Sequence, residues 1–413
     1  MLKDMYKKFA ADPFPGNMEI AFYDDGGSRT TLQYEKVQFS IDGKELGLRY
    51  GENPDQPATL YRLVNGNISL GDVRTISPGA ALSSSPELLQ SGKHPSKINI
   101  TDVDSALQIL KYLSHRPACV IIKHNNPSGA AVGETLEQAF TKALYADRIA
   151  AFGGAVAVNR TLDRSTAEAI MQGYVEVVAA PEFEDGVLEI LSTRKNLRVL
   201  RIREMSRLEN LLAKPTLEFS SLIDGGMIVQ TSFESAIHST QDFLPAETTY
   251  KGKPYKVDRQ PTQAELDDML FGWLVETGVT SNSVIYVKDG CTVGIGTGEQ
   301  DRVGVAEIAR DKAYRKLADT YAYTQYGKAL FEVSNEQRAD IEEQVRQKRG
   351  GLKGAVMVSD AFFPFRDGAE VGLNEGVSAI VQPGGSLRDY EIIETVNQYK
   401  AAMVFTGQRS FRH

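Results

Sequence analysis

Two adjacent basic side chains, Lys123 and His124, stand where a strand is predicted to end, and their types suit acid–base chemistry. The preceding run from Val120 to Ile122 is β-branched throughout, which indicates a strand buried on both faces. The following Asn-Asn-Pro-Ser-Gly, residues 125 to 129, predicts a turn that stops the strand abruptly. Ligands bind at the carboxyl ends of strands in open α/β sheets, so this position suits a site better than a helix surface would, and a solvated turn explains the pair equally well.

The Lys-His pair could supply a general base and a charge stabiliser. A neutral imidazole is the usual base near neutral pH, and like-charge repulsion from Lys123 favours the neutral form of His124. Held in a dry cleft, the Lys123 ammonium can stabilise a substrate oxygen that gains charge in the transition state. We therefore expect proton transfer at this point of the chain.

Several other segments place glycine, arginine or aromatic residues where a ligand could lie. The run from Ala150 to Gly154 indicates a strand with a close backbone approach, and close strand packing explains it equally well. The glycine-rich stretch from Gly294 to Arg302 suits an anion, although it lacks the spacing of nucleotide-binding loops. Three phenylalanines after Asp360 could stack on a flat heterocycle or belong to the core.

Composition and charge exclude several classes of protein. At 413 residues, with 42% hydrophobic and 24% charged residues, the chain is an ordinary globular protein of two domains or two halves. The net charge of -8 disfavours nonspecific binding to nucleic acid or to an anionic membrane. No apolar run is long enough to span a bilayer and no signal peptide is recognisable, so we expect a cytoplasmic protein.

The cysteines and histidines do not predict a zinc site. There are only 2 cysteines, which cannot build a disulfide framework, and the 5 histidines are scattered without a His-x-x-x-His pair. A metal ion, if one binds, would be held by oxygen ligands.

Helix and strand patterns alternate through most of the chain and predict an α/β fold. We expect an N-terminal arm over residues 1–45, a first α/β part over 46–210, a junction over 211–260 and a second α/β part over 261–413. Capping boxes at Thr135 and Thr262 each predict the start of a helix. Two strand-like runs joined by Asp289-Gly290 predict a β-hairpin in the second part.

Seven short motifs follow one another from about residue 48 to the C-terminus. They are Arg49-Tyr50-Gly51 with Asn53-Pro54 and Gln56, Lys123-His124 with Asn126-Pro127 and Gly129, Ala151-Phe152-Gly153-Gly154, Ser281-Asn282-Ser283, Gly294-Ile295-Gly296, Ser359 to Phe365, and Arg409 to His413. Together they resemble the transformylase domain of the bifunctional purine biosynthesis proteins, which is an AICAR formyltransferase. So many separate motifs in one order make chance agreement improbable.

The resemblance implies a fold of two tandem cytidine-deaminase-like α/β halves with mixed sheets and no zinc site. The reaction it implies is attack of the 5-amino group of AICAR on the formyl carbon of 10-formyltetrahydrofolate, which gives FAICAR and tetrahydrofolate. By the resemblance His124 is the base, Lys123 stabilises the tetrahedral intermediate or tunes His124, and Asn282 orients the amine or the formyl group. The delocalised lone pair of this amine makes it a poor nucleophile, so a base is needed there.

Other positions match the substrate contacts of the family. The resemblance assigns contacts with AICAR to Arg49, Tyr50, Gly153, Glu176, Arg302, Phe362, Arg409 and His413. It assigns the folate side to Val303, Asp367, Ser386 and Leu387. It also implies a homodimer with shared active sites and a potassium ion near them, for which Asp360 is a candidate ligand.

The sequence departs from the family in two respects. Only about 45 residues precede Arg49, too few for the usual IMP cyclohydrolase domain, so we expect a free-standing transformylase and a separate cyclohydrolase that acts downstream. Asp55 stands where the family commonly has His, and Asn125-Asn126-Pro127-Ser128 where Thr-Asn-Pro-Cys is common. Neither change touches the Lys-His pair.

Three alternatives stay open from the sequence. A deaminase or hydrolase on the same fold is disfavoured because the metal ligands are missing. A ribotide-binding sensor without catalysis is disfavoured by the intact Lys123-His124 pair. A different formyl donor, such as formyl phosphate made from formate and ATP, is disfavoured because no ATP-binding signature is present.

Overall fold

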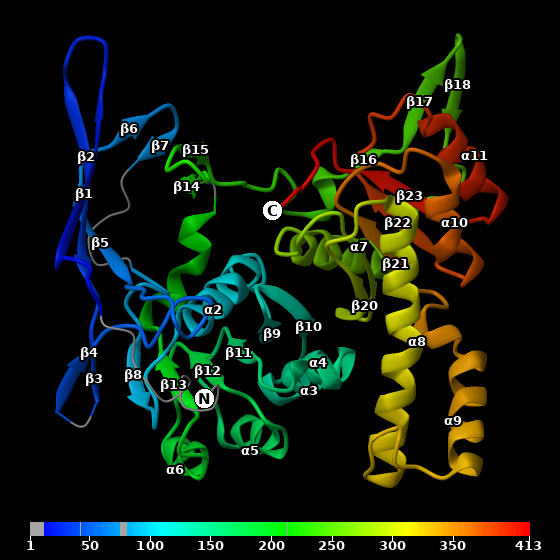
Figure 1. The fold of residues 1–413 in the computed structure, drawn as a ribbon. Helices are drawn as coiled ribbons and strands as arrows, with labels where there is room; N and C mark the ends of the chain where they lie inside the picture. The colour runs from blue at the N-terminus through cyan, green and yellow to red at the C-terminus, as the bar shows by residue number, and fades with distance from the viewer. Residues whose placement is uncertain (1–11, 42, 75–80, 213) are drawn as a thin grey trace. The chain divides into compact units, whose positions relative to one another are not determined.

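The computed structural model describes residues 12–41, 43–74, 81–212 and 214–413, and these form two compact units (Figure 1). Unit 1 comprises residues 1–114 and 154–234, and unit 2 comprises residues 115–153 and 235–413. This divides the chain differently from the expected boundary over 211–260, because residues 115–153 pack with the C-terminal part. The Lys-His pair therefore belongs to unit 2.

Unit 1 is built on a four-stranded sheet with an antiparallel arm. Strands β11 and β12 and strands β12 and β13 pair in parallel, and β13 pairs antiparallel with β8. The strands are β8 (Glu87–Gln90), β11 (Ala155–Val158), β12 (Val177–Ala180) and β13 (Arg198–Arg201), and the helices are α2 (Lys97–Leu110), α5 (Arg164–Gln172), α6 (Val187–Ser192) and the 3-10 helix η1 (Arg203–Leu211). The remaining strands are β1 (Asn17–Tyr23), β2 (Arg29–Lys36) and β5 (Tyr61–Gly66), which form one sheet, and the hairpins β3 (Phe39–Ile41) with β4 (Lys44–Leu46), β6 (Ser69–Leu70) with β7 (Val73–Arg74), and β14 (Leu217–Ser221) with β15 (Met227–Thr231).

Unit 2 contains a larger mixed sheet whose strand order is β16-β23-β22-β21-β19-β20-β10-β9. Its strands are β9 (Ala118–Lys123), β10 (Asn126–Val132), β16 (Leu244–Pro245), β19 (Val284–Lys288), β20 (Cys291–Gly296), β21 (Val356–Ser359), β22 (Ala379–Gln382) and β23 (Ala402–Phe405), with β17 (Glu247–Tyr250) and β18 (Lys253–Lys256) as a separate hairpin. Its helices are α3 (Leu136–Ala146), α4 (Arg148–Ala151), α7 (Gln263–Glu276), α8 (Arg302–Tyr326), α9 (Asn335–Gln347), α10 (Arg366–Asn374) and α11 (Asp389–Gln398), with short 3-10 helices η2 (Thr240–Asp242) and η3 (Arg349–Gly351). The predicted mixed α/β class is confirmed.

Helices cover both faces of the unit 2 sheet. Successive residues of β19 point to opposite faces. A Cβ atom at Gly272 of α7 would meet Val287, whereas one at Gly372 of α10 would meet Tyr286. The phenol of Tyr286 also donates to the carbonyl of Ala306 in α8 at 3.3 Å. Helix α7 therefore lies on one face, and α8 and α10 lie on the other.

Two glycines of β20 explain the glycine-rich stretch that looked suited to an anion. A Cβ atom at Gly294 would stand 2.3 Å from the carbonyl oxygen of Ala309, and one at Gly296 would stand 2.2 Å from that of Val305. Both positions lie in a strand, and their missing side chains allow α8 to pack against it. The anion-binding interpretation of these glycines is wrong.

Other local expectations also meet the structure. The hairpin of β19 and β20 turns at Asp289 and Gly290 with positive φ at both residues, as predicted. The capping box of Thr262 with Glu265 is present. The strand expected over the run from Ala150 to Gly154 is wrong, because Arg148–Ala151 forms the helix α4 and β11 begins only at Ala155. Among the described residues, no helix is long and apolar enough to cross a membrane.

Candidate active site

Lys123 and His124 lie at the tip of a β-hairpin. Lys123 is the last residue of β9, and His124 and Asn125 form a two-residue turn with φ of 55° and 61°. Strand β10 starts directly at Asn126, so the expected turn over residues 125–129 is shorter than predicted and most of that segment is strand. Left-handed backbone at both turn residues matches the right-handed twist of the flanking strands, which presents the His124 side chain to solvent.

The Lys123 side chain is held against the segment after α4. Its Nζ donates to the carbonyl oxygen of Phe152 at 2.6 Å, and Gly153, which follows, has φ of 75°. A left-handed conformation here favours glycine, so Gly153 allows the chain to turn beside Lys123. The structure thus brings Lys123, His124 and Gly153 together in unit 2.

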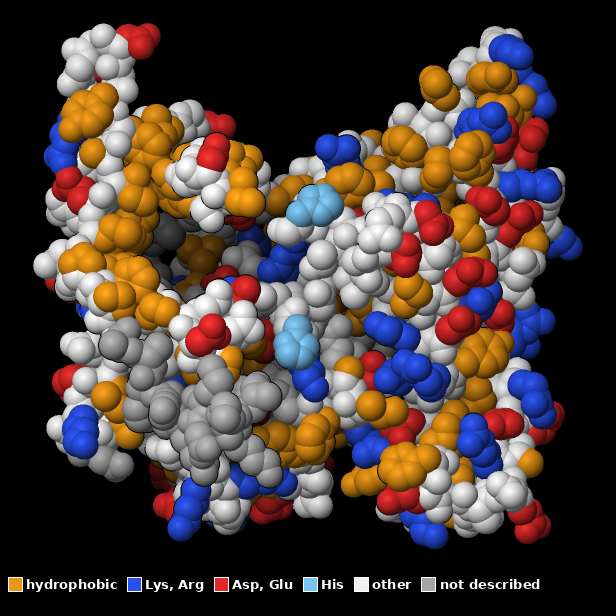
Figure 2. Space-filling model, in the orientation of Figure 1, with side chains coloured by type: hydrophobic (Ala, Val, Ile, Leu, Met, Phe, Trp, Pro, Cys, Tyr) orange, Lys and Arg blue, Asp and Glu red, His pale blue; other side chains and the backbone are white. Residues whose placement is uncertain are grey.

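A small cavity of about 160 Å³ opens under the hairpin and carries more positive than negative charge. Besides Lys123 and His124 it is lined by Lys312 and Lys316 of α8 and by Asp147. Lys316 Nζ lies 2.7 Å from Asp147 Oδ1, so this pair is neutralised. Burial lowers the pKa of Lys312, and the charges of Lys316 and Arg315 lower it further against the opposing effect of Asp147. Figure 2 shows Lys and Arg side chains gathered over α8.

Asn126 connects the hairpin to the segment that carries Asn282. Its Oδ1 accepts hydrogen bonds from the backbone N–H of Thr280 at 3.0 Å and from the hydroxyl of Thr297 at 3.1 Å. The Thr297 hydroxyl also lies 2.7 Å from the carbonyl of Thr280. This amide therefore fixes the backbone two residues before Asn282.

Asn282 is oriented by a buried arginine. Arg302 donates through Nη2 to Asn282 Oδ1 at 2.9 Å, and Asn282 Nδ2 donates to the carbonyl of Gln300 at 2.9 Å. Arg302 Nη1 contacts the Asp360 carboxylate, the carbonyl of Ser283 at 3.1 Å and the hydroxyl of Ser359 at 3.2 Å. Arg302 has 8% of its surface exposed, and these contacts are with groups inside the protein. The expected contact of Arg302 with a ribotide stays a prediction.

Two buried carboxylates share this network. Asp360 Oδ2 accepts from the Ser281 hydroxyl at 2.5 Å and from the Ser283 backbone N–H at 3.1 Å. Glu276 is fully buried and its Oε1 accepts from the Ser283 hydroxyl at 2.6 Å, while Oε2 has no side-chain or backbone hydrogen-bond partner assigned within the described part of the chain. Burial, and then the charge of Asp360, raise the pKa of Glu276 well above its usual value.

The donor set around Asp360 bears on the expected potassium ion. Both oxygens of Asp360 already accept hydrogen bonds from the protein, but the serine hydroxyls and the unpaired Glu276 oxygen are hard donors of the kind that alkali cations accept. The carboxylates of Asp360 and Glu276 face one guanidinium, that of Arg302. One further positive charge would balance them, so these residues suit a monovalent cation. Across the described ranges, no group of three or more His, Cys, Asp or Glu side chains could hold a metal ion.

The C-terminal segment is anchored to the same network. Ser410 donates its backbone N–H to the carbonyl of Asp360 at 3.0 Å, and Ser281 donates its backbone N–H to the carbonyl of Arg412 at 2.9 Å. Arg412 also reaches the carbonyl of Gly278 at 2.6 Å. This end of the chain is therefore held in place, and it presents exposed Arg409 and His413 nearby.

The aromatic turn and the folate-side positions follow the ends of parallel strands. Strands β21, β22 and β23 are parallel neighbours, so the loops that follow them lie at one edge of the sheet. Phe363 is fully buried and belongs to the core, whereas Phe362 is 41% exposed. The other predicted positions at this edge or at the adjoining helix starts are Val303, Asp367, Ser386 and Leu387. Leu387 is 90% exposed.

Arg49, Tyr50 and Glu176 are placed in unit 1. Arg49 is buried, donates to the Tyr50 hydroxyl and lies over the Tyr50 ring at 4.5 Å from the centroid. Glu176 precedes β12 and pairs with Arg198, a buried residue of β13. Burial lowers the pKa of Arg198 and that of His94, and the positive charge of Arg49 lowers both further.

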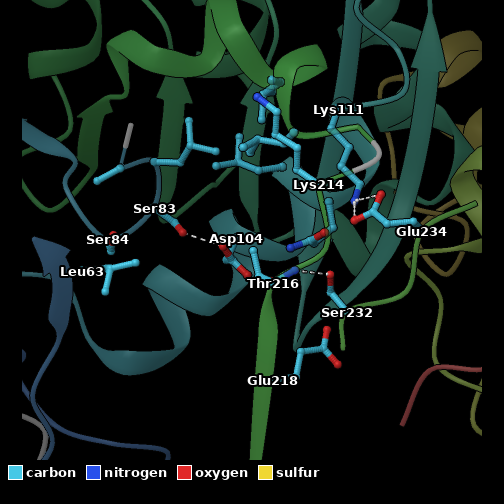
Figure 3. Close-up of a pocket in the computed structure, with 16 residues that line it drawn as sticks. Leu63, Ser83, Ser84, Asp104, Lys111, Lys214, Thr216, Glu218, Ser232 and Glu234 are labelled. Carbon is cyan, nitrogen blue, oxygen red and sulfur yellow. Dashed lines mark hydrogen bonds and ion pairs between the residues drawn. The ribbon is translucent and has the colours of Figure 1, made fainter. Parts of the chain in front are cut away.

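A second, larger cavity of about 340 Å³ lies in unit 1 (Figure 3). Its charged lining is largely paired: Lys111 Nζ lies 3.4 Å from Glu234, and Ser83 donates to Asp104 at 2.5 Å. None of the residues predicted for the site lines this cavity. Two of its polar pairs thus satisfy each other, and Lys214 and Glu218 also line it.

Comparison with known proteins identifies the family. A profile described as the AICARFT/IMPCHase bienzyme matches residues 15–312, which is most of the chain and includes Arg49, the Lys-His pair, Asn282 and Arg302. The chain belongs to this family. The segment of this family member that carries Asp360 and the folate-side positions Asp367, Ser386 and Leu387 lies beyond the matched residues.

Curated relatives of this AICARFT/IMPCHase family member are bifunctional purine biosynthesis proteins PurH. The protein from Caldicellulosiruptor saccharolyticus is 35% identical over 366 residues, which is 89% of this chain and 59% of the relative. That from Chlorobaculum parvum is 38% identical over 371 residues, which is 90% of this chain and 59% of the relative. The chain therefore spans about three fifths of the length of these relatives.

Sequence reasoning missed several residues of the site. Arg198, Glu276 and Lys312 are far in the sequence from the motifs or stand inside ordinary helix and strand patterns. A charged residue inside an apolar run was the available signal for Glu276, which ends Trp273-Leu274-Val275-Glu276. Lys312 and Arg198 give no such signal, because single basic residues are common on solvated surfaces.

Proposed function

We propose that this chain transfers the formyl group of 10-formyltetrahydrofolate to the 5-amino group of AICAR, in purine biosynthesis. The observation that carries the proposal is the His124 hairpin tip, which Asn126 ties to the Asn282 segment in a member of the AICARFT/IMPCHase family. The geometry joins an exposed imidazole, a lysine and an oriented asparagine within one unit. These are the groups that formyl transfer to a weak nucleophile requires.

The proposed step conserves atoms and charge. The AICAR amine forms a bond to the formyl carbon, and His124 takes the proton that the amine loses. The bond between the formyl carbon and N10 of the folate then breaks, and N10 takes up a proton to give tetrahydrofolate. Lys123 stabilises the negative charge on the formyl oxygen, and Asn282 holds the reacting groups in line because Arg302 fixes its amide.

The substrate contacts of the proposal come from the residues predicted for them. AICAR is assigned to Arg49, Tyr50, Gly153, Glu176, Phe362, Arg409 and His413, and the folate to Val303, Asp367, Ser386 and Leu387. Arg302, which is also predicted to contact AICAR, orients Asn282. A potassium ion, if it binds, would be held by the hydroxyls of Ser281 and Ser283 and by Glu276.

The decisive experiment is a spectroscopic assay of tetrahydrofolate formation from AICAR and 10-formyltetrahydrofolate. We expect turnover with the folate and none when formate and ATP replace it. AICAR binding without turnover by either donor would favour a ribotide-binding sensor. Turnover with formate and ATP alone would establish a different formyl donor.

A variant of the base tests the assignment of roles. We expect His124→Ala to reduce kcat by about 100-fold or more, because general bases contribute on the order of 10² to 10⁴. AICAR should still bind, as measured by calorimetry. The matched control is His238→Ala, which removes an exposed histidine of the same unit. A His124→Ala enzyme as fast as the control would contradict the assignment.

A further inference from the structure

Arg198 is a buried arginine that holds an exposed carboxylate. Its side chain is 5% exposed, its Nε donates to the carbonyl of Lys93 at 3.1 Å, and its Nη1 lies 3.6 Å from Glu176 Oε2. The Glu176 side chain is 39% exposed. The arginine thus supports the glutamate from inside unit 1.

A second side chain holds the same oxygen. Asn99, which caps the start of α2, donates through Nδ2 to Glu176 Oε2 at 3.4 Å. The other oxygen, Oε1, accepts no hydrogen bond from the described part of the chain. One oxygen of Glu176 is therefore fixed by the protein, and the other is left to accept a donor from outside.

The charges around Arg198 argue for a purpose beyond stability. Burying an arginine is costly unless an anion compensates it. The charge of Arg49 acts on Arg198 with the same sign, and burial already lowers the pKa of Arg198. The compensating carboxylate is partly exposed, so this pair stabilises the fold weakly. What the arrangement does provide is a carboxylate in one fixed orientation.

We propose that Arg198 is a positioning residue that holds the Glu176 carboxylate in one orientation, so that Oε1 accepts a hydrogen bond from a donor group of the ribotide. This inference rests on the proposed function, in which Glu176 contacts AICAR. A carboxylate can only accept, and a ribotide carries hydroxyl and amide donors that it could receive. Arg198 contacts Glu176 and not the substrate, so its effect should be on the affinity for AICAR.

The test is a double-mutant cycle of Arg198→Met and Glu176→Gln in the full chain. We expect each single variant to raise KM for AICAR by about 10-fold, equivalent to about 1.4 kcal/mol, with kcat within about twofold of wild type. The double variant should be no worse than the single ones, because Arg198 acts through Glu176. Arg198→Lys should recover part of the loss, since it keeps the charge but not both contacts.

The matched control is Arg203→Gln, which removes an arginine with ion pairs to Glu87 and Glu182 at 3.3 and 3.2 Å. It should leave KM unchanged. An unchanged KM in Arg198→Met, or effects of the two substitutions that add, would overturn the inference and leave a purely structural role. If Arg198→Met does not fold, Arg198→Lys and Arg198→Gln take its place in the cycle.

The failure of the inference and that of the proposed function are distinguishable. If the wild-type chain shows no formyl transfer, the proposed function fails. The same variants then report AICAR affinity by calorimetry, where the cycle has the same expected form. If wild type turns over and the cycle is additive, only the role of Arg198 fails.

Discussion

Arg302 illustrates how a buried residue can orient another residue of a site. From sequence it looks like an anion ligand near a helix start, yet its guanidinium contacts Asp360, Ser283, Ser359 and Asn282. Bidentate and multiple contacts of this kind fix a side chain in one rotamer. The buried arginine therefore sets the position of the Asn282 amide.

Glu276 should make the free energy of unfolding fall as the pH rises. Because its pKa in the folded state is raised, its contribution is fully present below about pH 4.5 and is lost as the pH rises toward the folded pKa. Each pH unit over which the folded glutamate stays protonated while the unfolded one is ionised costs about 1.4 kcal/mol. Glu276→Gln should remove this slope, as followed by urea unfolding at several pH values.

Repeating that measurement in two salts tests whether a potassium ion compensates the Glu276 carboxylate. If a potassium ion compensates the carboxylate, potassium chloride should stabilise the wild type above pH 7 relative to choline chloride, and Glu276→Gln should not respond. Equal stability in both salts would argue against a cation at this network. A wild-type protein whose pH profile matches that of Glu276→Gln would contradict the raised pKa.

At the scale of elements, Glu265 joins the start of α7 to β22 and to Arg259. Burial alone would raise its pKa, but hydrogen bonds from Arg259, the Ser378 side chain and the Thr262 backbone N–H lower the pKa of Glu265 to about 2. Its contribution is therefore present above about pH 4.5 and is lost as the pH falls through about 2.

Glu265→Gln should lower the free energy of unfolding at pH 7 by about 1 to 2 kcal/mol, once solvent screening of this partly exposed group is allowed for. The difference should shrink as the pH falls from 4.5 toward 2, in thermal unfolding followed by circular dichroism. Glu137→Gln, at an exposed first-turn position of α3, is the control and should differ little from wild type. A Glu265→Gln deficit that persists at pH 2 would refute this account.

The elements could be predicted where their signals are local. The hairpin at Asp289-Gly290, the capping box at Thr262 and the buried strand before Lys123 all depend on neighbouring residues, and all are present. The glycines of β20 were misinterpreted because the helix that requires them begins at Arg302 and packs back onto the strand. Likewise, the Asn-Asn-Pro sequence did not reveal that β10 begins inside it.

The site was predictable as a set of residues but not as a geometry. The motifs indicated Lys123, His124 and Asn282, whereas the links between them, through Asn126 and Arg302, need contacts that span 154 and 20 residues of sequence, respectively. Glu276 and Arg198 were not predicted at all, because burial and unpaired oxygens are properties of packing. Such properties are not written in any single stretch of sequence.

For the whole molecule, we expect a homodimer in which each active site takes residues from both chains. Arg49 and Glu176 lie in unit 1 and His124 lies in unit 2, so variants of the two groups can be mixed. Arg49→Ala and His124→Ala should each be inactive alone. After co-refolding in equal amounts they should recover about a quarter of wild-type activity, because half of the dimers are mixed and each holds one intact site.

Sedimentation velocity supplies the control for this mixing experiment, since it should report a dimer for each variant by itself. A mixture that stays inactive while mixed dimers form would place both groups in the same chain. A monomer at all concentrations would refute the shared site.

The anchoring of the chain's C-terminal residues has a consequence during synthesis. The Ser281 hydroxyl accepts a hydrogen bond from the backbone N–H of Arg412, which is synthesised 131 residues later. At about 5 to 20 residues per second, the ribosome takes roughly 7 to 26 s to cover that interval. During this time the nascent chain already contains Asn282 but lacks the segment that holds its neighbour.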